Sequence, residues 1–252
     1  MLKIRIIPTI LFNNFKLVKG ISFDSWRTVG SIMQAVKIYN LREVDELIVM
    51  DISATNNKSK VDLDLVNEIA NETFMPLTVG GGIKSIEDVS NLLEAGADKV
   101  SINTSTFNND FFVKEASKIF GRQCIVASVD YKIIDKEIVI FSNSGKVSQK
   151  VKFIDHIKKM EALGAGEIIL TSINLDGTMK GYDIETLSKA SANVEIPIIA
   201  SGGAGKLKDF TDAVKNTDVS ALAAASIYHF TNTTPRDVKI YLNSEKIPVR
   251  IN

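Results

Sequence analysis

Acidic side chains stand at the ends of several predicted strands, which is where an enzyme built on parallel strands carries its chemistry. Asp130 closes the apolar run 125–130, and Asp51 and Asp176 end or follow two other runs. A carboxylate at such a strand end can act as a general acid or base. Asp130 could instead be a loop carboxylate that caps a turn. Asp176 lies within the turn sequence 174–178, so the alternative role for its side chain is an Asx-turn.

Glycine-rich segments follow two predicted strands, at residues 80–82 and 202–203. Glycine lets backbone N–H groups approach an anion closely, and the next helix points its positive end to the same place. Small polar loops follow two further strands, at residues 103–104 and 225–226. We therefore expect two phosphate sites on one rim, although glycines that only permit tight turns remain the alternative.

The elements that must position these residues alternate along the chain. Eight strand-like runs lie at residues 3–11, 46–51, 77–80, 99–103, 125–130, 167–172, 198–201 and 220–224, with an extra hairpin strand at 133–141. Helical spacing lies between most of them; one example places Ile86, Val89, Leu92 and Leu93 on one face and Glu87, Asp88 and Glu94 on the other. Eight such βα units predict an α/β protein, a (β/α)8 TIM barrel.

An internal repeat supports this architecture. The segment 75–82 (MPLTVGGG) recurs as 196–203 (IPIIASGG), a displacement of 121 positions, and Glu46 recurs as Glu167 at the same displacement. The sequence therefore predicts one barrel over residues 1–252, made of half-barrels at about 1–120 and 121–252.

Composition excludes several function classes. The 252 residues carry 30 basic and 30 acidic side chains, and this balance gives no support to a nucleic-acid or membrane partner. The chain has no apolar run of about 18 residues and no signal-peptide core, so we expect a cytoplasmic protein. The single cysteine, Cys124, cannot form an intrachain disulfide. His156 and His229 are too far apart to suggest a metal site, and no cofactor motif is present.

Four segments together resemble the cyclase subunit of imidazole glycerol phosphate synthase. They are residues 79–83, 97–104 (ADKVSINT), 166–172 (GEIILTS) with 176–178, and 198–205 (IIASGGAG). The resemblance runs without a large gap from residue 3 to about residue 250. It implies a complex with a glutaminase, whose ammonia passes up through the barrel to a substrate with two phosphates that is cleaved and cyclised.

The resemblance also implies individual roles on the upper rim. Asp130 matches the second catalytic aspartate of the family, and Lys19 matches the lysine of a mobile loop after strand one. The two phosphate sites match Gly82, Asn103 and Thr104 in one half, and Asp176, Gly177, Gly203, Ala225 and Ser226 in the other.

At the opposite mouth, the resemblance implies a charged gate for ammonia. Its members are Arg5, Glu46, Lys99 and Glu167, which lie at or near the starts of four strands. Asp98 matches a position that faces the glutaminase. Without the resemblance, the four charges would be interpreted as a structural salt-bridge ring, because the lower rim of a barrel usually serves stability.

One position departs from the family. Its first strand ends in a stretch like CLDVKDG, whereas residues 8–15 here read PTILFNNF, with Leu11 in the place of the catalytic aspartate. Leucine cannot transfer a proton, and losing one positioned acid or base costs about 10²- to 10⁴-fold. The pattern resembles family members encoded with surface-polysaccharide genes, which supply ammonia to a separate sugar amidotransferase that builds acetamidino groups.

Three functions follow as hypotheses. The chain is expected to be an ammonia-conducting barrel subunit for nitrogen transfer to a sugar. The second hypothesis is a histidine-pathway cyclase that tolerates Leu11, and the third is a non-catalytic scaffold that only activates its glutaminase.

Overall fold

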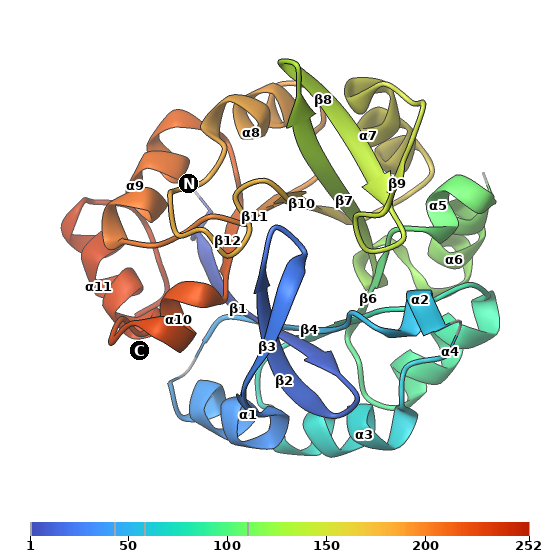
Figure 1. Ribbon diagram of the computed structural model, residues 1–252, viewed down its shortest axis with the longest axis horizontal. Coiled ribbons are helices and arrows are strands. Elements are labelled where there is room, and N and C mark those ends of the chain that lie inside the picture. Colours follow the sequence, from blue (N-terminus) through green and yellow to red (C-terminus); the bar gives the residue numbers. More distant parts are fainter. Residues whose placement is uncertain (1, 43, 58, 110, 252) are drawn as a thin grey trace.

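A computed structural model describes residues 2–42, 44–57, 59–109 and 111–251. Within them, eight parallel strands form a closed barrel (Figure 1). Closure is complete because β10 pairs with both β7 and β11, and β12 pairs with β1. The barrel strands are β1 Arg5–Asn13, β4 Leu47–Asp51, β5 Leu77–Gly80, β6 Lys99–Ile102, β7 Ile125–Ile134, β10 Glu167–Ser172, β11 Ile198–Ser201 and β12 Ala221–Ala224. The predicted TIM barrel is confirmed.

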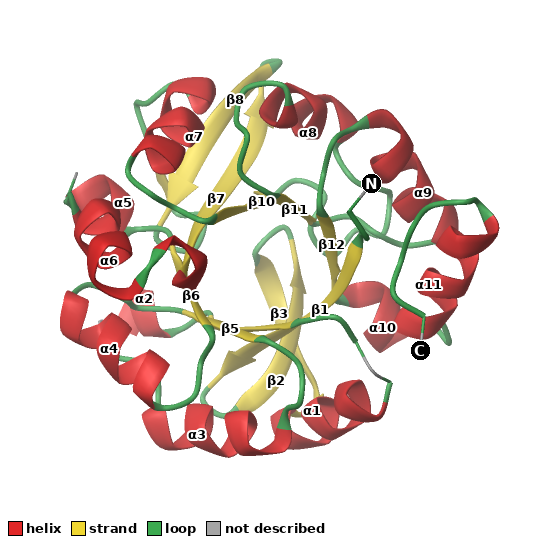
Figure 2. Cartoon of the chain, turned by 180° about the vertical axis from the view of Figure 1, so that it is seen from behind, coloured by secondary structure: helices red, strands yellow, loops and turns green. Residues whose placement is uncertain are grey.

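Helices surround the barrel (Figure 2). The outer ring consists of α1 Ile32–Leu41, α3 Leu63–Glu72, α4 Ile86–Glu94, α6 Phe112–Phe120, α7 Phe153–Ala162, α8 Ile184–Ser191, α9 Leu207–Asn216 and α11 Pro235–Ser244. Shorter turns of helix lie in the loops: α2 Ala54–Asn57, α5 Ser105–Asn108, η1 Arg122–Cys124 and α10 Ser226–Phe230. Among the described residues, no helix combines the length and the apolar character that crossing a membrane requires.

Helix α4 shows how local sequence produces this ring. Val89 and Leu92 are buried against the barrel, as the spacing predicts. Ser85 caps the first turn by accepting a hydrogen bond from the Asp88 N–H, and the Asp88 carboxylate bonds back to the Ser85 N–H. Asp88, which the spacing places on the face opposite the apolar residues, is only 8% exposed, because this reciprocal cap holds its side chain against the first turn.

The internal repeat is visible in the strand registers. Leu47 pairs with Leu77, and Ile168 pairs with Ile198, each partner displaced by the same 121 positions. The β4–β5 and β10–β11 pairs therefore occupy equivalent places in the two halves of the barrel.

Two antiparallel excursions rise from the upper rim, and the sequence pattern predicts only the second of them, with different bounds. The segment expected as a loop after strand one is a hairpin of β2 Lys16–Ile21 and β3 Asp24–Ser31, so β1 runs on past residue 11 to pair with it. The strand expected at 133–141 is split, because Asp135 and Lys136 turn the chain with positive φ between β7 and β8 Glu137–Ser142, to which β9 Val147–Ser148 adds a short edge.

A buried ion pair fastens the last helix to the bottom of the barrel. Lys239 of α11 donates to Asp45 Oδ1 at 2.7 Å, and the other oxygen, Oδ2, accepts the Ile6 N–H at 2.8 Å. Both side chains of the pair are under 8% exposed. Because both charges have left water, the pair tolerates the loss of neither partner.

We therefore expect Asp45→Ala to lower the free energy of unfolding by about 3–5 kcal/mol, since it leaves the Lys239 ammonium buried without this carboxylate. Urea denaturation checks it. Glu185→Ala, which breaks the exposed Glu185–Lys189 pair on α8, is the matched control and should cost much less. Equal losses in the two variants would contradict the anchoring role.

Candidate active site

Four charged side chains form an alternating ring at the lower mouth of the barrel. Arg5 donates to Glu46 at 2.8 Å and to Glu167 at 2.9 Å. Lys99 donates to the same two carboxylates at 3.0 and 3.3 Å. Two cations and two anions thus neutralise each other around the axis, in the arrangement expected of the gate; its role in ammonia passage stays a prediction.

One side chain inside the barrel hydrogen-bonds to the ring, and one exposed carboxylate lies beside it. Thr78 of β5 donates its hydroxyl to Glu46 Oε1 at 2.8 Å, which fixes the glutamate from above. Asp98 is exposed beside Lys99, and one of its oxygens accepts the Leu77 N–H at 2.8 Å. Asp98 therefore lies at the same mouth as the ring, where a partner could reach it.

An apolar layer separates this ring from the upper half of the barrel. Its side chains are buried and form a cluster of their own on the barrel axis: Ile7, Ile48, Val126, Ile169, Ile199, Ala221 and Ala223. An ion would lose its hydration here without gaining a partner, whereas a small neutral molecule loses far less.

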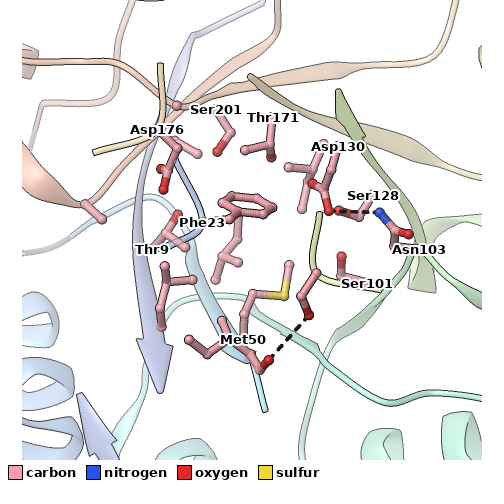
Figure 3. Close-up of a pocket in the computed structure, with 18 of the residues that line it drawn as sticks. Thr9, Phe23, Met50, Ser101, Asn103, Ser128, Asp130, Thr171, Asp176 and Ser201 are labelled. Atoms are coloured by element: carbon pink, nitrogen blue, oxygen red, sulfur yellow. Dashed lines mark hydrogen bonds between the residues drawn. The ribbon is translucent and has the colours of Figure 1, made fainter. Parts of the chain in front are cut away.

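A cavity of about 160 Å³ opens above this layer at the upper rim (Figure 3). It brings together all ten residues that the sequence predicts to serve catalysis or phosphate binding: Lys19, Gly82, Asn103, Thr104, Asp130, Asp176, Gly177, Gly203, Ala225 and Ser226. The charged ring is not part of it and lies at the other end of the barrel.

Asp130 lies at the end of the barrel stretch of β7, and its side chain faces the cavity. Asn103 donates to its Oδ2 at 2.9 Å, and the hydroxyls of Thr171 and Ser128 also donate to the carboxyl group. Burial, reinforced by the nearby negative charge of Asp176, raises the pKa of Asp130 to about 7 despite these donors. A carboxyl group with this pKa can give or take a proton near neutral pH.

Lys19 and Asp176 form a buried ion pair of 2.6 Å across the cavity wall. Lys19 was expected on a loop, but it lies in β2, and pairing of β2 with β1 and β3 carries its side chain inward to 2% exposure. The hairpin is held down a second time by the Ser22 N–H, which donates to the Asp176 carbonyl at 2.8 Å. Asp176 is thus an anchor of the hairpin as well as a cavity residue.

The glycine loops have the backbone that the sequence predicts. Gly82 and Gly203 have φ angles of 64° and 111°, which an L side chain rarely adopts. The Gly82 N–H donates to Thr55 Oγ1 at 3.2 Å. A phosphate bound at this turn would accept from the same N–H group, either together with Thr55 or in its place. Ser226 Oγ and Asn103 Oδ1 are buried without a partner among the described residues, and both line the cavity. Phosphate binding at these loops remains a proposal.

Leu11 lines the same cavity from β1, where it pairs with Met50 of β4 and Val18 of β2. The expected placement of residue 11 on the upper rim is therefore what the structure has. The third rim carboxylate, Asp51, is engaged structurally: its Oδ1 accepts the Ser53 N–H at 2.8 Å and the Ala54 N–H at 3.1 Å, which caps α2.

Several cavity residues were missed in the sequence. Ser128, Thr171 and Ser201 face inward on β7, β10 and β11, and counting two residues back from Asp130 would have found the first. Phe23 and Trp26 also line the cavity, but they belong to the hairpin where the sequence predicts a loop, so strand periodicity gives no signal for them.

The sequence profile of the family described as "Histidine biosynthesis protein" matches residues 5–234. The chain belongs to this family. It is 42% identical over 249 residues to the imidazole glycerol phosphate synthase subunit HisF of Clostridium botulinum (strain 657 / Type Ba4), covering 98% of both chains. The HisF subunits of Staphylococcus carnosus and Hydrogenobaculum sp. are 42% and 40% identical over 252 residues, covering 99% and 100% of each chain. The family predicted from the sequence motifs is confirmed; these relatives carry no indication of a surface-polysaccharide branch.

The raised pKa of Asp130 predicts a pH-dependent stability. The folded protein keeps this proton up to about pH 7, whereas the unfolded chain releases it near pH 3.8. The protonated carboxyl group therefore stabilises the folded state at low pH, and this stabilisation is lost as the pH rises from about 3.8 to about 7. At about 1.4 kcal/mol per pKa unit, the loss reaches at most roughly 4 kcal/mol.

Asp130→Asn removes this titration, so its stability relative to wild type should increase from pH 4.5 to pH 8. Urea denaturation at pH 4.5, 6 and 8 measures the difference, in which the titration of other groups cancels. A difference that stays constant over this range would show that Asp130 titrates normally.

Proposed function

We propose that this protein is the ammonia-accepting barrel subunit of a glutamine-dependent amidotransferase, in which ammonia meets a phosphorylated ligand in the upper cavity. One observation carries the proposal. The charged ring and the Asp130 cavity lie at opposite ends of one barrel interior, with an apolar layer between them. Neutral ammonia can cross such a layer, whereas ammonium and other ions cannot cross it cheaply.

The lower face supports a glutaminase partner. Besides the ring and Asp98, it carries two of the most exposed apolar side chains of the chain, Phe74 at 89% and Leu41 at 83%. The Phe74 N–H donates to Asn40 Oδ1 at 3.3 Å, which places these two side chains on adjoining segments. Exposed aromatic residues beside a polar rim are typical of a protein interface. The chain itself offers no Cys–His pair for hydrolysing glutamine.

The upper rim supports a phosphorylated ligand. Two glycine turns, Gly82 and Gly203, face one cavity together with the unpartnered hydroxyl of Ser226. Backbone N–H groups in such turns bind phosphate oxygens without the cost of desolvating a charged side chain.

Two acceptor reactions remain as candidates. The relatives are imidazole glycerol phosphate synthase subunits over their whole length, which favours formation of imidazole glycerol phosphate. Leu11 favours nitrogen transfer through a separate sugar amidotransferase that builds acetamidino groups, because the cavity lacks the carboxylate at that position. A non-catalytic scaffold does not explain why a charged ring and a polar cavity lie at opposite ends of one barrel interior.

The first test addresses the ring. With its cognate glutaminase, the chain should raise glutamine hydrolysis, and Lys99→Ala or Glu167→Ala should lower the product formed per glutamine hydrolysed several-fold. Hydrolysis itself should change less, because the ring controls passage rather than the glutaminase site. Product and glutamate are measured in the same reaction, with Glu185→Ala as the control. Unchanged coupling would leave the ring a structural salt bridge.

The second test separates the two acceptors through residue 11. Wild type should form imidazole glycerol phosphate slowly, and Leu11→Asp should raise the rate by about 10-fold or more, towards the 10²-fold or larger effect of a positioned acid or base. Growth without histidine of a strain lacking its own barrel subunit provides the same comparison in cells. Wild-type turnover equal to that of Leu11→Asp would show that no carboxylate is needed there; product from neither chain would favour the sugar acceptor.

A further inference from the structure

The substitution at residue 11 leaves the cavity without a carboxylate from strand β1, but not without a second carboxylate. Asp176 lines the same cavity from the loop that follows β10. Figure 3 shows Asp176 and Thr9 of β1 on one side of the cavity and Asp130 on the other, with the ring of Phe23 between them. Asp176 therefore lies on the same side of the cavity as Thr9 of β1, the strand that also carries residue 11.

The two carboxyl groups occupy contrasting electrostatic environments. Asp130 has neutral donors only, namely Asn103, Ser128 and Thr171, and it holds a proton near neutral pH. Asp176 has the Lys19 ammonium 2.6 Å from its Oδ2, which stabilises the negative charge. The charge on Asp176 is also close enough to raise the pKa of Asp130. One acid and one base facing each other is the arrangement that proton transfer in both directions requires.

A role confined to phosphate binding explains Asp176 poorly. A carboxylate repels a phosphate of the same sign, and the N–H groups of the glycine turns on this rim can bind phosphate without it. The carboxylate is also not the only contact of Asp176 with the hairpin, because the Ser22 N–H donates to the Asp176 carbonyl.

We infer that Asp130 and Asp176 are the acid–base pair of this cavity, and that Asp176 performs the proton transfers for which residue 11 has no group. The inference rests on the proposed function, since ammonia is the nucleophile. The acceptor is a carbonyl carbon of the phosphorylated ligand.

The proton balance closes over two steps. As ammonia bonds to the carbonyl carbon, the π electrons move to oxygen, Asp130 protonates that oxygen, and Asp176 takes a proton from nitrogen. The product is a neutral carbinolamine. On dehydration, Asp176 returns its proton to the departing hydroxyl, which leaves as water, and Asp130 accepts a proton from nitrogen as the C=N bond forms. Both carboxyl groups end in their starting states.

A double-mutant cycle between residues 11 and 176 tests the inference. Wild type, Asp176→Asn, Leu11→Asp and the double variant are assayed as full chains for imidazole glycerol phosphate, with an ammonium salt as nitrogen source and the substrate that the synthase cyclises. In the wild-type background, Asp176→Asn should lower kcat about 100-fold or more, with a smaller change in KM. In the Leu11→Asp background, the same substitution should cost less than about 10-fold, because the carboxylate introduced on β1 then performs the transfers.

Asp176→Glu in the wild-type background should recover part of the rate, since a carboxylate returns to the cavity. If Asp176 only binds phosphate or anchors the hairpin, Asp176→Asn costs the same in both backgrounds, and the inference is overturned while the proposed function stands. An inactive wild type beside an active Leu11→Asp variant also overturns it, because Asp176 would not have replaced residue 11. Product from neither chain overturns the imidazole glycerol phosphate assignment, and the inference with it.

Discussion

The alternation of side chains along eight parallel strands is the constraint on which the rest of the structure depends. Every second residue of each strand faces the barrel axis, so the interior is a stack of layers. Here the stack runs from the charged ring through isoleucine and valine to hydroxyl side chains and finally Asp130. A one-residue slip in any strand would reverse its contribution to every layer. The order of the layers, rather than any single residue, places an apolar layer between the charged ring and the polar cavity, where an ion would lose its hydration without gaining a partner.

The second determinant is how each buried charge is balanced. The ring pairs two cations with two anions, and Lys239 with Asp45 and Lys19 with Asp176 pair one with one. Asp130 has no cation in contact: among the described residues its partners are neutral, and its negative neighbour makes ionisation harder. A carboxyl group that titrates near neutral pH costs folding free energy above that pH, which points to function.

The sequence predicts most of the fold because its signals are local or repeated. Strand runs, helical spacing and the displacement by 121 positions predict the barrel, and the family resemblance adds the assignment of ten residues to one rim. The sequence pattern did not predict the β2–β3 hairpin, because its turn is Ser22–Phe23. These two residues have φ of 51° and 62°, where glycine or asparagine is the usual sequence signal. Two further features cannot be predicted from the sequence. The Lys19–Asp176 pair joins residues 157 positions apart, and the pKa of Asp130 depends on burial that only the folded cavity creates.

The hairpin connects these features. A phenylalanine with positive φ is strained by about 1–3 kcal/mol, and the strain persists only where surrounding contacts overdetermine it. Here the contacts are the Ser22 N–H on the Asp176 carbonyl and Lys19 on its carboxylate, and they place the Phe23 ring between Asp130 and Asp176. The ring therefore lines the same cavity as both carboxyl groups.

The hairpin that lines the cavity also supplies the ammonium beside one of the two carboxyl groups. Lys19 lies in β2, whereas Asp176 lies in the loop after β10, so their 2.6 Å contact depends on the hairpin lying over the barrel mouth. The side chains of the pair are only 2% and 12% exposed, and an ion pair strengthens as water is excluded from it. A carboxylate at residue 11 would instead be positioned by the barrel strand β1, without the hairpin cation in contact with Asp176. In the acid–base pair inferred here, the contrast between Asp130 and Asp176 therefore comes from the hairpin and not from the barrel strands.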